Sequence, residues 1–455
     1  MPTSATEITH DHSDAQPADI PRLREELIRE LRELKAIVTP EVEQAVRAVL
    51  RHLFIPEVPV EKAYAAEHHY VTKKDEHGVS ISSVSAARIQ AMMLEQAEVR
   101  PGMRVLEIGS SGYNAALLAE LVGEAGQVTS IDIDQDVIDR AARLLPAAGY
   151  ENVHLRRTDG EFGAPEHAPF DRIIVTVCAW DLPPAWSDQL AEGGRLVVPL
   201  RMRGLTRSVA FEQENGRLVD RGYELCGFVP MQGVGERRER LVSLHGDDVR
   251  LRLDDDQQAD ADGLRAALPM PRQEAWSGIT VGKNTRFDGL YLLMAMTLPD
   301  FGLLAATKAA MDRGLVAHSW GLGVPTLLDG DSFAYLTFRA TSEAREQFEY
   351  GAFGHGPHAD TTVEKLVGLI RSWDGTSLNA RITAYPAHTP DELLPPDALV
   401  LARRHTRIAI TWPSPAAASG SVRRDEEGAQ VSVQPAAPSG RRVRSHPEGP
   451  PKASA

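Results

Sequence analysis

A short apolar run that ends in a glycine turn constrains this 455-residue chain more than any other feature. Residues 105–108 predict a buried parallel strand, residues 109–112 (Gly-Ser-Ser-Gly) a tight turn, and the residues that follow a helix packing back on that strand. Residues 128–132 predict a second strand, which ends at Asp132, 23 positions after Gly109. Roughly 20 residues separate the glycine turn from the ribose-binding acid in a nucleotide-binding βαβ unit. The sequence therefore predicts a nucleoside ligand on a doubly wound α/β sheet.

The residues around the turn distinguish a methyl donor from a dinucleotide. A pyrophosphate needs glycines close to a helix N-terminus, where backbone N–H groups bond its oxygens. S-adenosylmethionine (SAM) carries no phosphate, and its methionine end needs room beside a short glycine turn. Glu107, which precedes the turn, suits a ligand with a sulfonium and an ammonium group. These features favour SAM, and a glycine turn in some other α/β enzyme is the alternative.

The composition indicates a large soluble enzyme. With 42% hydrophobic residues the chain can bury substantial cores, and its length suggests two or three domains. The net charge of −15 argues against a nucleic-acid partner, because binding a phosphate backbone relies on clustered Lys and Arg. Cys178 and Cys226 do not make a disulfide framework, and no apolar run is long enough to cross a bilayer. The N-terminus lacks the apolar core of a signal peptide, so we expect a cytoplasmic enzyme without a membrane partner.

Several collinear motifs resemble the protein-L-isoaspartate O-methyltransferase family over residues 23–240. The motifs are residues 23–27, 46–57, 80–82, 105–112, 159–160, 165–176, 193–199 and 228–230. At family-like spacing they are far more specific together than any one of them alone. The resemblance covers roughly half of the chain and leaves the C-terminal half unexplained. It implies a Rossmann-like domain that binds SAM and methylates a carboxylate.

The chain is expected to form two folded parts with polar ends. Residues 1–19 and 414–455 are predicted to be disordered, the tail because Pro, Ala, Ser and Gly dominate it. Residues 20–244 are predicted to be the catalytic domain, with packing helices ahead of a doubly wound sheet. Residues 245–413 are predicted to be a second, α+β domain that binds the substrate or braces its site.

Local patterns predict the main elements of both parts. Residues 245–262, rich in Asp, Gln and Arg, predict a linker. A helix is expected from Thr361 to Trp373, begun by Asp360 as N-cap and stopped near Gly375. Strands are expected at residues 104–108, 128–132, 153–156, 171–176, 195–200, 278–281, 333–338, 380–385 and 407–412.

The resemblance also assigns cofactor-binding roles, which converge because ligands of such sheets bind at the carboxyl ends of the strands. Glu107 would face the methionine end, and Asp132 would bond the ribose hydroxyls beside Ile133. Asp159 and Gly160 would bracket the adenine. The donor turn would be formed by Gly109, Ser110 and Gly112.

Methylation of a carboxylate is mainly a problem of geometry. An Asp side chain with a pKa of about 3.9 is already anionic at neutral pH, so no general base is required. The enzyme must hold the carboxylate in line with the methyl group in a dry site. Ser82 stands where the family has its active-site serine and would orient the carboxylate. A turn or N-cap serine ahead of a helix beginning near Val84 is an alternative that is compatible with this role.

Two departures from the family pattern point to a dedicated substrate. The donor turn is one residue shorter than the usual Gly-x-Gly-x-Gly, and Ser83-Val84 stands where repair enzymes usually have Gln-Pro. With the extra domain, these departures resemble the FxLD-system branch, whose lanthipeptide-associated members methylate an Asp of a modified precursor peptide. The ester then leads to succinimide or isoaspartate.

Weaker candidates surround the acceptor loop. His68, His69 and Tyr70 line the peptide site in one interpretation, together with Ser83; a metal site formed with His77 is disfavoured because the spacing fits no zinc pattern. In the second domain, His355 lies in a predicted glycine-rich loop, residues 353–358, which either binds substrate or is a plain connection before the helix.

The hypothesis is therefore a SAM-dependent carboxyl methyltransferase that acts on a modified precursor peptide. General isoaspartate repair, with an isoaspartyl protein as the partner, is the enzymatic alternative. A non-catalytic adaptor that binds SAM or isoaspartyl peptides is the alternative from another class. Because every predicted donor residue precedes residue 245, truncation there is expected to leave SAM binding largely intact.

Overall fold

A computed structural model describes residues 19–76, 78–109, 112–254, 257–317, 319, 323–373 and 380–412. The predicted disordered ends lie outside the described residues except for Asp19, whose carboxylate accepts a hydrogen bond from Arg22 N and caps the first helix. His77, Ser110, Ser111 and Gly375 also lie outside the described residues.

The larger sheet contains the predicted doubly wound fold. Its described strands are ordered β18-β19-β17-β9-β8-β7-β6-β3-β4-β5, and the block from β7 to β5 is parallel. The chain winds from β3 outward to β5 and then returns to the other side of β3 with β6, which creates a switch point between β3 and β6. The strands are β3 (Arg104–Ile108), β4 (Gln127–Asp132), β5 (Val153–Arg157), β6 (Phe170–Val175), β7 (Leu190–Met202), β8 (Leu205–Glu214) and β9 (Arg217–Leu225). The strand predictions for this region are confirmed.

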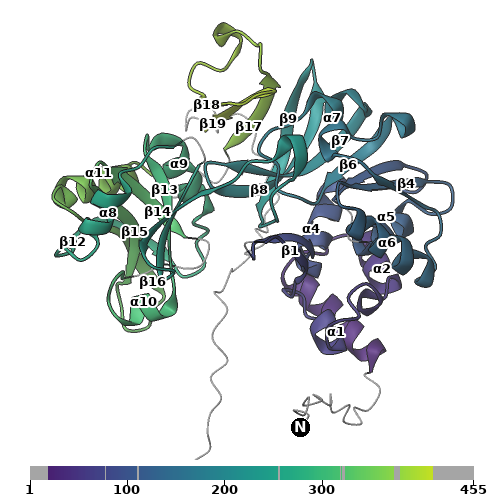
Figure 1. Ribbon diagram of the computed structural model, residues 1–455, viewed down its shortest axis with the longest axis horizontal. Coiled ribbons are helices and arrows are strands. Elements are labelled where there is room, and N and C mark those ends of the chain that lie inside the picture. The colour runs from purple at the N-terminus through teal and green to yellow at the C-terminus, as the bar shows by residue number, and fades with distance from the viewer. Residues whose placement is uncertain are drawn as a thin grey trace, which may run out of the picture.

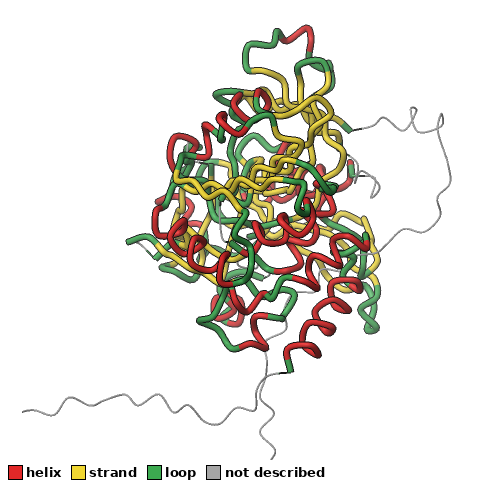
Figure 2. Tube along the Cα trace, turned by 90° about the vertical axis from the view of Figure 1, so that its right-hand side faces the viewer, coloured by secondary structure: helices red, strands yellow, loops and turns green. Residues whose placement is uncertain are grey.

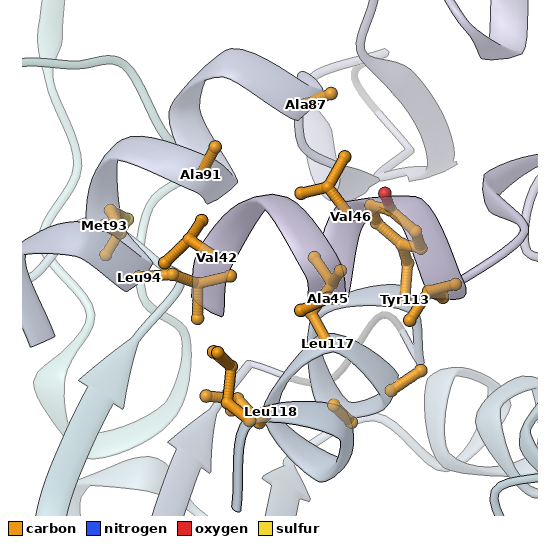
Figure 3. Close-up of a cluster of buried hydrophobic side chains, with 14 of the residues drawn as sticks. Val42, Ala45, Val46, Ala87, Ala91, Met93, Leu94, Tyr113, Leu117 and Leu118 are labelled. Atoms are coloured by element: carbon orange, nitrogen blue, oxygen red, sulfur yellow. The ribbon is translucent and has the colours of Figure 1, made fainter. Parts of the chain in front are cut away.

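Helices cover one face of this sheet and form a shared core with it. Figure 3 shows α2, α4 and α5 meeting through Val46, Ala91, Leu94 and Leu117, all buried. On the opposite face, α7 contributes Trp186, whose side chain is fully buried. The helices are α1 (Ile20–Glu33), α2 (Pro40–Ala48), α3 (Val60–Ala63), α4 (Ala87–Ala97), α5 (Tyr113–Val122), α6 (Gln135–Ala147) and α7 (Pro184–Asp188), with 3-10 turns η1 (Arg51–Leu53), η2 (Gly160–Phe162), η3 (Pro165–His167) and η4 (Gly233–Gly235).

A two-stranded hairpin stands apart from both large sheets. Strand β1 (Tyr70–Lys74) pairs antiparallel with β2 (Ser80–Val84). The expectation that a helix begins near Val84 is wrong, since α4 begins at Ala87 after the N-cap residue Ala86. Ser82 is therefore a strand residue and not a turn or N-cap serine.

The second sheet is antiparallel and has the order β10-β11-β13-β14-β15-β16-β12. Its helices α8, α10 and α11 gather on the left of Figure 1, away from the N-terminal helices. The bounds are β10 (Arg240–His245), β11 (Val249–Leu253), β12 (Gln273–Gly282), β13 (Phe301–Ala306), β14 (Val324–Asp329), β15 (Ser332–Ala340), β16 (Gln347–His355), α8 (Ala261–Ala267), α9 (Asp288–Thr297), α10 (Lys308–Asp312) and α11 (Ala359–Ser372).

Three local expectations for this region need correction. Residues 245–262 are not a linker, because β11 lies within them and buries Val249, Leu251 and Leu253 in alternation. The helix near residue 361 is present, but its N-cap is His358 and not Asp360. The first half of the predicted loop 353–358 is the end of strand β16.

The last three described strands return to the first sheet. They are β17 (Arg381–Pro386), β18 (Leu399–Ala402) and β19 (Thr406–Thr411), with η5 (Asp391–Leu393) between β17 and β18. Strand β17 pairs antiparallel with β9, and the group projects at the top of Figures 1 and 2. The strands predicted at residues 380–385 and 407–412 are confirmed, but they do not belong to the second sheet. The second sheet is thus inserted between strands of the first.

Helix α9 joins the two bodies through both of its faces. Leu292 and Met296 pack into the core of the first sheet, whereas Leu290 and Met294 pack into the core of the second. Arg207 of β8, almost fully buried, donates from Nη2 to the Asp288 carbonyl at 3.0 Å. The two sheets therefore share a helix as well as two chain connections.

Candidate cofactor and acceptor site

A cavity opens at the carboxyl ends of the central parallel strands. Ile108 and Gly109 follow from β3, Asp132 from β4 and Thr176 from β6, and all four residues line it. Gly160, after β5, lines it as well. The cavity therefore lies at the switch point of the sheet, where ligands of doubly wound folds bind.

The donor turn leaves no room for a side chain at its first glycine. Gly109 has φ +97°, and a Cβ at this position would lie 2.8 Å from Thr176 Oγ1 and 3.0 Å from Val177 Cγ1. Thr176 Oγ1 donates a hydrogen bond to the Gly109 carbonyl, which ties the turn to β6. Gly112, at φ +81°, is the N-cap of α5, while Ser110 lies outside the described residues. The backbone here requires glycine for both conformation and space.

Two acidic residues predicted for the cofactor have different surroundings. Asp132 lines the cavity next to Ile133, and its Oδ1 accepts from Asp134 N at 2.8 Å. Asp159 is not among the lining residues; its carboxylate accepts from Glu161 N at 2.9 Å and Val234 N at 2.9 Å. Asp159 thereby shapes the loop that presents Gly160.

Glu107 is fully buried beneath the turn and does not line the cavity. Its Oε1 accepts from Asn114 Nδ2 at 2.8 Å, and its Oε2 accepts from Ser130 Oγ. The pKa of Glu107 is raised to about 7, chiefly by burial and to a smaller extent by the charge of Asp132, although the hydrogen bonds from Ser130 and Asn114 act in the opposite direction. Glu107 thus links β3, β4 and α5 behind the cofactor cavity.

Strand β2 of the β1–β2 hairpin borders the cavity on the side predicted to bind the acceptor. Ser82 and Ser83 both line it, and Ser82 Oγ accepts from Thr72 Oγ1 at 2.8 Å. Gln232 Nε2 donates to the Ile81 carbonyl at 3.3 Å, which connects the hairpin to the loop after β9. Ser82 therefore stands beside the donor turn with its hydroxyl proton available to a substrate carboxylate.

Ion pairs attach strand β1 of the hairpin to the start of helix α6. Lys73 Nζ lies 2.5 Å from Asp134 Oδ2 and 2.7 Å from Asp136 Oδ2. Asp134 is also the N-cap of α6. The hairpin is thus attached to the segment that follows Asp132.

Arg51 connects the residues that flank the β1–β2 hairpin to helix α5, which follows the donor turn. Its buried guanidinium donates to the Ser85 carbonyl at 2.7 Å and to the His68 carbonyl at 3.2 Å. The same group lies 4.7 Å from the ring centroid of Tyr113, the first residue of α5. The sequence analysis assigned no role to Arg51.

The histidines and the tyrosine that were predicted to bind the peptide do not lie together at the cavity. His68 is half-buried, His69 is exposed, and Tyr70 begins β1; none of the three is among the cavity-lining residues. His355 is buried in β16, stacked against Phe333 with ring centroids 5.3 Å apart, and burial lowers its pKa to about 4. His355 is thus a neutral core residue of the second sheet.

Several lining residues carried no predicted role. Thr176 and Val177 could have been found, because they follow a predicted parallel strand and so reach the same edge as Gly109. Val229 and Met231 belong to the loop after β9, whose position depends on long-range contacts. Among the described lining residues, the side chains are apolar, hydroxyl, amide or carboxylate, and none is Lys or Arg.

The site fits SAM better than a phosphate-bearing cofactor. The Asp132 carboxylate lies at the end of β4, where the sequence predicts the ribose-binding acid. Ile108, Ile133 and Met231 supply apolar walls, and no described lining residue offers a cation to a phosphate. The fold and the cavity define the class of Rossmann-like methyltransferases.

Comparisons narrow the class to one family. The sequence profile of Protein-L-isoaspartate(D-aspartate) O-methyltransferase (PCMT) matches residues 22–236. A protein-L-isoaspartate O-methyltransferase of Methanococcoides burtonii is 38% identical over 205 residues, 45% of this chain and 98% of that protein. Protein-L-isoaspartate O-methyltransferase 2 of Archaeoglobus fulgidus is 35% identical over 216 residues, 47% of this chain and 95% of that protein. The chain belongs to the protein-L-isoaspartate O-methyltransferase family, whose members are SAM-dependent carboxyl methyltransferases.

Solved structures give similar matches. A protein-L-isoaspartate O-methyltransferase covers 79% of this chain and 96% of its own, with 22% identity and a TM-score of 0.44. The Plasmodium falciparum protein, solved with S-adenosyl-L-homocysteine, covers 46% of this chain and 98% of its own, with 20% identity and a TM-score of 0.39.

The described part of the chain contains no helix that is both long and apolar enough to span a membrane. The same residues include no group of three or more His, Cys, Asp and Glu side chains suited to a metal ion.

Proposed function

We propose that this protein methylates the side-chain carboxylate of an aspartate in a ribosomally made, lanthipeptide-type precursor peptide. When bound, SAM supplies the methyl group on a sulfonium centre. The backbone nitrogen after the methylated residue would then attack the ester carbonyl and lose its proton as methanol leaves. The product is a succinimide, which stays or opens to isoaspartate.

The cofactor roles follow from the residues around the cavity. Asp132 binds the ribose hydroxyls, the turn at Gly109 and Gly112 leaves room for the methionine end, and Gly160 borders the adenine. Asp159 supports Gly160 through the backbone bonds described above. Glu107 acts from behind the turn by holding Asn114 and Ser130.

Ser82 orients the substrate carboxylate. Because Thr72 donates to its oxygen, Ser82 can donate its own proton to an incoming carboxylate oxygen. An aspartate is already ionised at neutral pH, so the site needs position and exclusion of water more than a base.

One observation carries the choice of a dedicated peptide. The two archaeal relatives match this chain over 98% and 95% of their own length but cover less than half of it, and the part that they do not cover includes most of a seven-stranded sheet. The connection from β9 to that sheet contacts the β1–β2 hairpin, because Gln232 Nε2 donates to the Ile81 carbonyl at 3.3 Å. Remote contacts of this kind can be used to position a flexible peptide for reaction.

A comparison of two substrates tests the proposal. We expect clear methylation of an Asp-containing, cyclised precursor peptide and little methylation of a linear isoaspartyl hexapeptide, measured as kcat/KM by mass spectrometry. Ser82→Ala is the control variant, because it should lower methyl transfer to whichever of the two peptides the wild type accepts.

General repair is the second candidate, and the family comparisons are compatible with it. Efficient methylation of the linear isoaspartyl peptide would favour repair over the precursor peptide. SAM binding without transfer to either peptide would favour a binding-only adaptor.

A further inference from the structure

The turn between β18 and β19 reaches the cofactor side of the first sheet from the far end of the chain. His405 Nε2 lies 2.8 Å from Glu161 Oε1, and its backbone N donates to Asp181 Oδ2 at 2.7 Å. Thr406 Oγ1 donates to Asp181 Oδ1 at 2.6 Å. None of these four residues is among those that line the cavity.

Both segments that the turn contacts carry lining residues. Glu161 belongs to η2 and directly follows Gly160, while Asp181 lies in the loop that continues from Thr176 and Val177. Arg403 of the β18–β19 turn stacks on Trp180 of that loop, with Cζ 3.5 Å from the ring centroid. The turn therefore connects two segments that both contribute residues to the lining of the cavity.

The loop at η2 has little freedom to adjust by itself. A Cβ at Gly160 would lie 2.6 Å from Ile108 Cγ2, and Trp186 Nε1 donates to the Gly160 carbonyl at 2.8 Å. The Glu161 side chain is only 8% exposed, so its bond to His405 is formed largely out of water. A carboxylate only accepts hydrogen bonds, so His405 is the donor.

We infer that His405 is a positioning residue for the cofactor: through Glu161 it holds η2, and thereby Gly160, in the form that SAM binds. The profile match ends at residue 236, so this contact comes from a part of the chain that the repair-type unit does not include. The inference rests on the proposed cofactor site but not on the identity of the peptide.

Paired variants separate the hydrogen bond from packing. His405→Phe keeps a ring and loses the donor, whereas His405→Gln keeps a donor at nearly the position of Nε2. Mutations that act through a network typically change coupling by about 0.5–2 kcal/mol, so we expect His405→Phe to weaken S-adenosyl-L-homocysteine binding by about 2- to 30-fold. His405→Gln should stay within about twofold of the wild type. Arg404→Ala, an exposed neighbour in the same turn, is the matched control.

The measurements are calorimetric Kd values for S-adenosyl-L-homocysteine with the full-length chain, and KM values for SAM and peptide. The inference requires a rise in Kd and in the KM for SAM, with the KM for peptide unchanged. An unchanged Kd in His405→Phe would overturn it, and so would equal losses in both His405 variants, because the role would then be packing alone. If the wild type itself fails to bind S-adenosyl-L-homocysteine, the proposed cofactor function fails as well.

Discussion

Glu107→Gln should make the stability of the protein less dependent on pH. The Glu107 carboxyl is fully buried, and burial raises its pKa from 4.5 to about 7 in the folded chain. In the unfolded chain the side chain is solvated and has its ordinary pKa. Glutamine has nearly the same shape, can accept from Asn114 and can turn its amide toward Ser130, but it does not titrate.

The direction in which pH changes the free energy of unfolding follows from the protons bound by the folded and unfolded states. Below about pH 4.5 both states hold the proton, so the contribution of Glu107 to stability is fully present there. Between about pH 4.5 and pH 7 only the folded state holds it, and the contribution is lost as the pH rises through about 7. A shift of about 2.5 pKa units at 1.36 kcal/mol each corresponds to a loss of about 3 kcal/mol.

Denaturant unfolding at pH 5, 6, 7 and 8 measures this loss as a difference between variant and wild type, in which the other titrating groups cancel. The free energy of unfolding of Glu107→Gln should rise relative to the wild type by about 3 kcal/mol from low to high pH. Glu124→Gln, at an exposed position, should give a flat difference. A flat difference for Glu107→Gln would refute the reasoning, since the buried carboxyl would then be ionised throughout.

Three further predictions concern the site. Asp132→Ala removes charge-assisted hydrogen bonds to ribose worth about 1.5–3 kcal/mol, so calorimetry should show SAM binding weakened about 10- to 100-fold; unchanged affinity in a folded variant would remove Asp132 from the site. Gly109→Ala places a Cβ against Thr176 at φ +97°, which should destabilise the protein by about 1–3 kcal/mol in denaturant unfolding; an unaltered midpoint would contradict the close packing. Ser82→Ala should lower kcat for methyl transfer about 10- to 100-fold with an unchanged Kd for SAM, and a variant as fast as the wild type would exclude the orienting role.

The parallel strands were predictable because their signal is local. Strands β3, β6 and β7 each contain an apolar stretch that is buried, as expected for central strands covered on both faces. Strand β11 was missed because its arginines and the acidic residues nearby suggested a linker, although Val249, Leu251 and Leu253 alternate with them. Period-two alternation is the better indicator where composition is mixed.

The pairing partner of a strand is not a local property. The alternation of Ile382 and Ala384 shows that one face of β17 is buried, but it does not identify β9 as the neighbouring strand. For this reason we revise the truncation prediction. A chain that ends at residue 245 would lose β17 to β19 and expose a core that includes Ile408 and Ile410, so we expect it to aggregate.

The site was predictable where residues follow parallel strands, and less so elsewhere. Gly109, Asp132 and Gly160 meet as expected because the carboxyl ends of β3, β4 and β5 share an edge. Ser82 was expected in a turn because the polar triplet around it has no apolar alternation; it becomes a strand only by pairing with β1. The burial of Glu107 could not be read from its neighbours in sequence, because its partners come from α5 and β4.

The return of β17 to the first sheet sets the order in which the protein can assemble during synthesis. Strand β9 ends at Leu225 and its partner begins at Arg381, 156 positions later. At roughly 5–20 residues per second, the ribosome needs about 8 to 30 s to translate that interval. Throughout this time one side of β9 has unpaired N–H and C=O groups, which attract other strands. The nascent chain must therefore protect an open sheet edge until its own far end emerges and pairs with it.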